Sequence, residues 1–157
     1  MNKAADIIDL AVAIELECAA LYEVFGRCFA GRDEVVYFWR LYAEAERYHA
    51  ASIRIHQAAF TGEDATSGLQ VGRDEAAAVL EQIKGLRVGF ERTAPTISEA
   101  LAAARQVEET SAELHGRTQF FKLHPHFEEL FLKMAEEDRA HRDVLATAEK
   151  RFAQPAA

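Results

Sequence analysis

The stretch AEAERYHA, residues 43–50, places Glu46 and His49 three positions apart within an apolar helical pattern. A related stretch, AEEDRAHR at 135–142, repeats the carboxylate-x-x-histidine spacing as Asp138 and His141. Residues three apart lie on one face of an α-helix, but a single pair of this kind is most often a solvated surface contact. The surrounding sequence therefore has to decide whether these pairs are buried.

Apolar residues recur at three-and-four spacing through most of the chain, which is typical of amphipathic helices. GRD at 31–33 supplies a helix stop and an N-cap, the glycine- and serine-rich segment 61–72 reads as loop, and Asp74 is suited to cap the helix that follows. LHP at 123–125 predicts a further turn, and AQPAA a frayed tail. Helices are expected at about 5–29, 34–60, 74–94, 98–122 and 126–152.

No alternating strand pattern interrupts these segments, so we expect an all-α chain. Short turns make the first two and last two helices antiparallel hairpins, at 5–60 and 97–152. The segment 61–96 is long enough to cross the bundle between them. The sequence thus predicts one domain, 1–157: a four-helix bundle of two antiparallel hairpins with a long crossover that contains an extra helix.

The two carboxylate–histidine pairs each have a glutamate at the same height on the preceding helix. Glu15 lies 31 residues before Glu46, and Glu108 lies 30 residues before Asp138. At about 1.5 Å per residue, antiparallel partners equally far from their shared turn lie at one level. Because this arrangement occurs twice, the pairs are predicted to belong to one site.

All of these polar residues interrupt apolar faces, as Glu46 does between Trp39 and Ile53. Buried carboxylates without partners are strongly disfavoured, so a common counter-charge is required. Two divalent cations would balance four carboxylates with two neutral histidines. A ligand set rich in oxygen and free of thiolate favours iron or manganese, with zinc as an adventitious occupant.

The composition excludes other classes of function. The formal net charge is −8 and no basic cluster is present, so neither nucleic acid nor an anionic membrane is an expected partner. Cys18 and Cys28 are the only cysteines and form no C-x-x-C pair. The N-terminus becomes acidic too early for a signal peptide, and no apolar run spans a bilayer, so a cytoplasmic location is expected.

With these stretches the chain resembles the ferritin-like superfamily, and within it the rubrerythrin-like di-iron carboxylate proteins. The resemblance rests on AVAIELECAALY and AEAERYHA, and on their second copies ARQVEETSAELH and AEEDRAHR. It implies a carboxylate-bridged di-iron centre that reacts with hydrogen peroxide or dioxygen, bridged by Glu46 and Glu108. The implied ligands are Glu15, Glu46, His49, Glu108, Asp138 and His141.

The chain departs from the family pattern in three respects. Asp138 stands where the family has glutamate, with neighbouring Glu137 as an alternative that the apolar stripe disfavours. Ser111 stands where rubrerythrins proper carry an extra glutamate used in peroxidase chemistry. These 157 residues contain no cysteine-ligated rubredoxin module, so electrons are expected to come from another protein or a small molecule. Tyr22, seven residues after Glu15, is expected either to hydrogen-bond a ligand or relay an electron, or to be a packed aromatic.

Three functional hypotheses follow. The first is an oxidoreductase in which two iron ions reduce peroxide or dioxygen, as a peroxidase or ferroxidase. The second is a protein that oxidises, stores or delivers iron without turnover of a separate substrate, and the third is a metal-free helical interaction module. We also expect a homodimer, from apolar faces left exposed on the crossover helix.

Overall fold

The computed structural model of the chain describes residues 3–59, 69–116 and 125–152. Within these ranges every element is an α-helix, which confirms the expected all-α class for the described part of the chain. None of these helices is both long and apolar enough to cross a membrane. The helices are α1 (Lys3–Cys28), α2 (Asp33–Ala59), α3 (Leu69–Arg92), α4 (Ile97–Gly116) and α5 (Pro125–Phe152).

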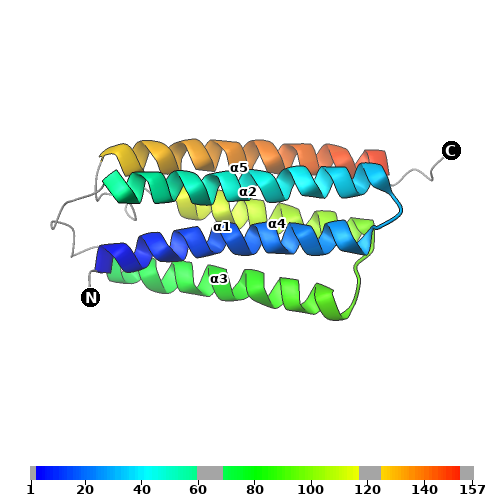
Figure 1. The fold of residues 1–157 in the computed structure, drawn as a ribbon, viewed down its shortest axis with the longest axis horizontal. Coiled ribbons are helices and arrows are strands. Elements are labelled where there is room, and N and C mark those ends of the chain that lie inside the picture. Colours follow the sequence, from blue (N-terminus) through cyan, green and yellow to red (C-terminus); the bar gives the residue numbers. More distant parts are fainter. Residues whose placement is uncertain (1–2, 60–68, 117–124, 153–157) are drawn as a thin grey trace.

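The helices form an elongated bundle (Figure 1). α1 and α2 are an antiparallel pair, and α4 and α5 are a second one. Between the two pairs, α3 runs along the length of the bundle beside α1 and returns the chain to the end where α2 begins. As a result, α4 runs antiparallel to α1, and α5 runs parallel to it.

The turn between α1 and α2 lies where the sequence predicts it. Gly31 has a φ of 102°, a conformation that glycine adopts without steric cost. The carbonyl oxygen of Arg32 then accepts hydrogen bonds from the backbone N–H groups of Val35 and Val36, at 2.8 and 3.0 Å. Asp33 and Glu34 occupy the first turn of α2, where negative charge is favourable.

The start of α4 is fixed by a capping box at Thr96 and Glu99. The Glu99 carboxylate accepts a hydrogen bond from the Thr96 backbone N–H at 2.7 Å, and the Thr96 hydroxyl accepts one from the Glu99 backbone N–H at 3.2 Å. These two bonds satisfy donors that a helix N-terminus otherwise leaves unpaired. Pro95, just before them, cannot continue α3.

The prediction for the start of the third helix is wrong. α3 begins at Leu69, so residues 69–72 are helical rather than loop, and Asp74 lies inside the helix rather than at its N-cap. Leu69, Gln70 and Arg73 favour helix, and Gly72 costs a helix only about 1 kcal/mol. Residue 60, residues 117–124 and residues 153–157 lie outside the described ranges, and with them the predicted ends of the second and fourth helices, most of the LHP turn and the tail.

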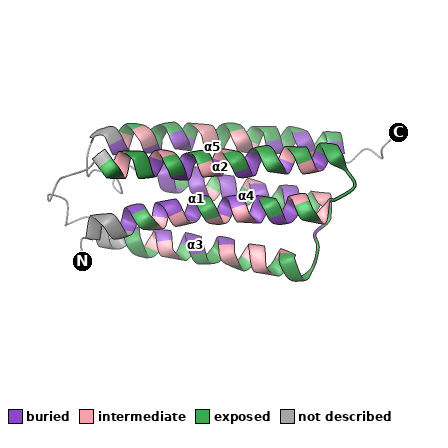
Figure 2. Cartoon of the chain, in the orientation of Figure 1, coloured by how far each residue is buried: buried purple, intermediate pink, exposed green. Residues whose placement is uncertain are grey.

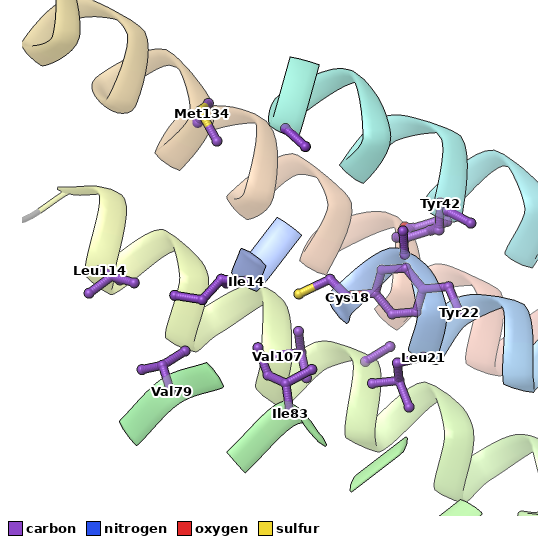
Figure 3. Packing of buried hydrophobic residues seen from close by; sticks show 14 of the residues in the cluster. Ile14, Cys18, Leu21, Tyr22, Tyr42, Val79, Ile83, Val107, Leu114 and Met134 are labelled. Carbon is purple, nitrogen blue, oxygen red and sulfur yellow. The ribbon is translucent and has the colours of Figure 1, made fainter. Parts of the chain in front are cut away.

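Buried side chains line the facing sides of the helices (Figure 2). They form one apolar cluster to which all five helices contribute. Figure 3 shows Val79 and Ile83 of α3 on the side of the bundle that carries Ile14 of α1 and Val107 of α4. α3 therefore closes one side of the core.

On α3, Val79, Leu80 and Ile83 are buried because the helix packs along α1, whereas Leu86 and Phe90 are only partly buried. The expected homodimer therefore stays a prediction. Among the described residues, the more exposed large apolar side chains lie on α1, α2 and α5. They are Leu16, Tyr37, Leu41, Tyr48, Ile55, Leu132 and Val144.

Candidate metal centre

The six predicted ligands lie together in the interior of the bundle. They come from four helices: Glu15 from α1, Glu46 and His49 from α2, Glu108 from α4, and Asp138 and His141 from α5. Five of them are at most 3% exposed, and the side chain of His141 is 24% exposed. Such burial of four carboxylates is unfavourable without bound counter-charges.

Three of these residues form a first group of possible metal ligands. Nδ1 of His49 lies 3.2 Å from Oε2 of Glu15 and 3.1 Å from Oε2 of Glu46. Two ligand atoms of one ion, each bonded at about 2.1 Å, are at most about 4.2 Å apart. These distances therefore suit one ion held by Glu15, Glu46 and His49.

A second group uses the opposite side of Glu46. Nδ1 of His141 lies 3.5 Å from Oε2 of Glu108 and 3.9 Å from Oε1 of Glu46. Glu46 thus belongs to both groups and turns one carboxylate oxygen to each. This is the position that a bridging carboxylate requires. Glu108 belongs to the second group alone, so the structure gives no support to Glu108 as a second bridge.

Asp138 points into the site, whereas Glu137 lies at its edge. Asp138 is 1% exposed, and its Oδ1 lies 3.9 Å from Nδ1 of His49. The side chain of Glu137 is 36% exposed, and its Oε2 contacts Nε2 of His49 at 2.9 Å. Glu137 is therefore placed to orient the His49 ring, as carboxylates commonly do for metal-binding histidines.

Tyr22 reaches the site from α1. Its ring is fully buried and its hydroxyl donates a hydrogen bond of 2.6 Å to Oε1 of Glu108. Tyr22 thus contacts a predicted ligand on the opposite hairpin, and its role in electron relay stays a prediction. Tyr42 also approaches the site, and its hydroxyl donates to the backbone oxygen of His141 at 2.8 Å.

The histidines balance part of the negative charge. Burial alone would lower the pKa of His49, but hydrogen bonds with Glu15 and Glu46 outweigh burial and raise it to about 12. Burial would also lower the pKa of His115, which the charge of Glu15 and a hydrogen bond with Asp138 raise to about 10. Metal-free protein at neutral pH therefore holds protons on these rings.

The carboxylates differ in the direction of their pKa shifts. Burial and the charge of Glu108 raise the pKa of Glu46. Burial would likewise raise the pKa of Glu15, but His115 and His49 outweigh it and lower the pKa. Burial and the surrounding carboxylates raise the pKa of the Cys18 thiol. Cys18 belongs to neither group of possible ligands, whose donor atoms are nitrogen and oxygen.

Several buried polar atoms in the site lack hydrogen bonds. Within the part of the chain that the structure describes, Nδ1 of His141 forms no hydrogen bond of normal geometry, and Nε2 of His115 and Oε1 of Glu15 face each other at 3.2 Å without forming one. An unsatisfied buried polar atom costs about 1–3 kcal/mol. Nδ1 of His141 belongs to the second ligand group, where a cation would engage it, so the residues present fit a metal centre.

A cavity of about 270 Å³ lies between α2 and α5 and gives access to one side of the site. His49 and Glu137 line it together with Ser52, His56 and Lys133. Small ions and small oxidants can enter such a space, whereas the buried Glu15 and Glu108 are not among its lining residues.

Comparison of the chain with protein-family models, with curated proteins and with solved structures found no match.

Sequence reasoning missed His115 as a residue of the site and named Glu137 only as an alternative ligand to Asp138. His115 is 1% exposed and contacts Asp138 at 2.8 Å through Nδ1. One signal was present, because His115 occupies in the second half the position of Tyr22 in the first. The contact of Glu137 with His49 gave no such signal, because it depends on α5 packing against α2.

Proposed function

We propose that the chain is a di-iron carboxylate redox protein of the ferritin-like type, similar to rubrerythrin, that reacts with hydrogen peroxide or dioxygen. The observation that carries this proposal is the pair of buried ligand groups that share Glu46. The hairpin–crossover–hairpin order of the helices supports it.

Glu15 and His49 would hold one ion, Glu108 and His141 the other, and Glu46 both. When bound, two iron ions supply the electrons that reduce the oxidant. The chain orients these ligands through Tyr22 and Glu137, and its apolar core excludes bulk water from Glu15 and Glu108. The cavity beside His49 is the proposed access route for small reactants.

The donor set supports iron or manganese over a structural zinc site. Oxygen and imidazole donors with no thiolate suit iron and manganese, whereas structural zinc sites are four-coordinate and closed. Of the two metals, iron is the one that the resemblance to rubrerythrin-like proteins implies. Ser111, at the position of the extra glutamate of rubrerythrins, is buried, and it brings no carboxylate to the site. We therefore propose reaction with dioxygen or peroxide without the peroxidase chemistry that depends on that glutamate.

The test is anaerobic loading with Fe(II), followed separately by peroxide and by air. We expect about two irons per chain, oxidation of both by at least one oxidant, and repeated oxidation when an external reductant is supplied. Uptake of many irons per chain would instead favour storage. A protein that retains no iron after desalting would contradict the proposal.

A further inference from the structure

Among the residues whose burial the structure describes, His115 is the buried histidine that the proposed ligand set does not use. Its Nδ1 lies 2.8 Å from Oδ2 of Asp138, and its Nε2 lies 3.2 Å from Oε1 of Glu15. In the described structure, neither Nε2 of His115 nor Oε1 of Glu15 forms a hydrogen bond of normal geometry. His115 is thus held between two carboxylates from different helices, α1 and α5.

The internal repeat assigns His115 a counterpart. Residues of the second half lie 92 or 93 positions after their counterparts in the first, so Glu108 matches Glu15 and His115 matches Tyr22. Tyr22 crosses from α1 to Glu108 on α4, and His115 crosses from α4 to Glu15 on α1. Each contacts the glutamate of the opposite hairpin.

The two glutamates present their oxygens in the same way. Oε2 of Glu108 faces His141, and its Oε1 accepts the Tyr22 hydrogen bond. Oε2 of Glu15 faces His49, and its Oε1 faces His115. The oxygen that faces the ligand histidine is the one available to an ion, so the partner of the other oxygen sets the angle of the carboxylate.

His115 can contact two carboxylates at once, because its imidazole has two ring nitrogens, whereas the phenol of Tyr22 has a single hydroxyl. His115 uses the second nitrogen for Asp138, which stands where the repeat predicts a glutamate to match Glu46. The aspartate arm is one methylene shorter than that of Glu46, and His115 contacts its Oδ2. The two departures from the repeat are therefore in contact with each other.

We propose that His115 is a positioning residue that orients Glu15 and Asp138, as Tyr22 orients Glu108, and that His115 and Asp138 form a matched pair. This inference rests on the proposed metal centre. As a consequence, the two ions depend on different residues: binding of the ion at Glu15 depends on His115, and binding of the ion at Glu108 depends on Tyr22. Because His115 contacts Oδ2 of Asp138, Glu46 is the carboxylate left to turn one oxygen toward each ion.

The first experiment compares three variants by anaerobic Co(II) titration followed in the visible spectrum. We expect His115→Phe to weaken one of two binding steps by about 10–100-fold and Tyr22→Phe to weaken the other. Tyr37→Phe is the control, because Tyr37 is 60% exposed on α2 and belongs neither to the two ligand groups nor to the lining of the cavity beside His49. It should leave both steps unchanged.

The second experiment tests the pairing of His115 with Asp138. The double variant His115→Tyr, Asp138→Glu rebuilds in the second half the pattern of Tyr22 and Glu46. We expect Asp138→Glu alone to weaken Co(II) binding, because the longer arm moves the carboxylate away from its contact with Nδ1 of His115, and the double variant to recover at least tenfold of that loss. Equal affinities in the single and double variants would overturn the pairing.

The outcomes separate this inference from the proposed function. A wild-type chain that binds no Co(II) would contradict the metal centre itself. Two ions in the wild type, with His115→Phe unchanged or with both steps weakened equally, would overturn the positioning role alone. Circular dichroism checks the helical content of each variant, and His115→Gln, which keeps one donor, replaces His115→Phe if the latter does not fold. It should weaken the same step by a smaller factor.

Discussion

Protons and metal ions compete for the same nitrogen atoms in this site. The pKa of His49 is raised to about 12 and that of His115 to about 10, so metal-free protein at neutral pH carries protons on these rings. Nδ1 of His49 must be free of its proton to bind an ion. We expect Co(II) binding to release at least one proton per chain, measured with an indicator in weakly buffered solution.

The apparent affinity should then rise roughly tenfold per pH unit for each proton released, between about pH 6 and 8. Titrations at these two pH values check the slope. An affinity that does not change with pH would show that the histidines are not the atoms that bind.

The free energy of unfolding of the metal-free protein should fall as pH rises, whereas the affinity for metal should rise. A group with a raised folded-state pKa stabilises the fold below its unfolded pKa, and this contribution is lost as pH rises through the folded-state value. For His49 this window runs from about 6.5 to about 12. We therefore expect urea denaturation in the presence of a chelator to give a lower free energy of unfolding at pH 9 than at pH 7.

At the residue scale, the sequence predicted that six candidate ligands would lie together, because carboxylates that interrupt an apolar face at one height leave a clear pattern. The structure brings five of them into two groups of possible ligands, and Asp138 lies beside the first group. The role of His115 could not be predicted in the same way. Its contacts with Glu15 and Asp138 join α4 to α1 and α5, and spacing within one helix carries no information on such contacts. The same reason applies to Glu137 and His49.

At the scale of elements, α3 is proposed to support the bundle without contributing a ligand. Ile83 is 2% exposed and packs in the central apolar cluster. We expect Ile83→Ala to lower the free energy of unfolding by about 2–4 kcal/mol while the protein still binds two Co(II) ions. Ile55→Ala, at a position 69% exposed on α2, is the matched control and should change stability by less than about 0.5 kcal/mol.

Loss of a bound ion in the Ile83→Ala variant, with helical content intact, would show that α3 helps to shape the site.

The boundaries of the helices could be predicted from the sequence only in part. The turn at Gly31 was predictable, because glycine and the capping residues are local signals. The early start of α3 at Leu69 was not, because composition suggested a loop while residues 69–72 favour helix only weakly.

At the scale of the whole molecule, the homodimer stays a prediction. Leu86 and Phe90 of α3 are partly exposed, and the more exposed large apolar side chains of the described residues lie on α1, α2 and α5. Light scattering after gel filtration measures the mass directly. A homodimer would give twice the chain mass of 17.5 kDa, and a monomer would contradict the prediction.

The central claim is that one carboxylate, Glu46, serves two metal ions. Anaerobic Fe(II) titration of wild type, Glu46→Gln and Glu108→Gln tests it most directly, with circular dichroism as the check on folding. We predict saturation at two ions per chain in the wild type, severe weakening of both steps in Glu46→Gln, and weakening of one step in Glu108→Gln. Two ions bound with wild-type affinity by Glu46→Gln would contradict the account.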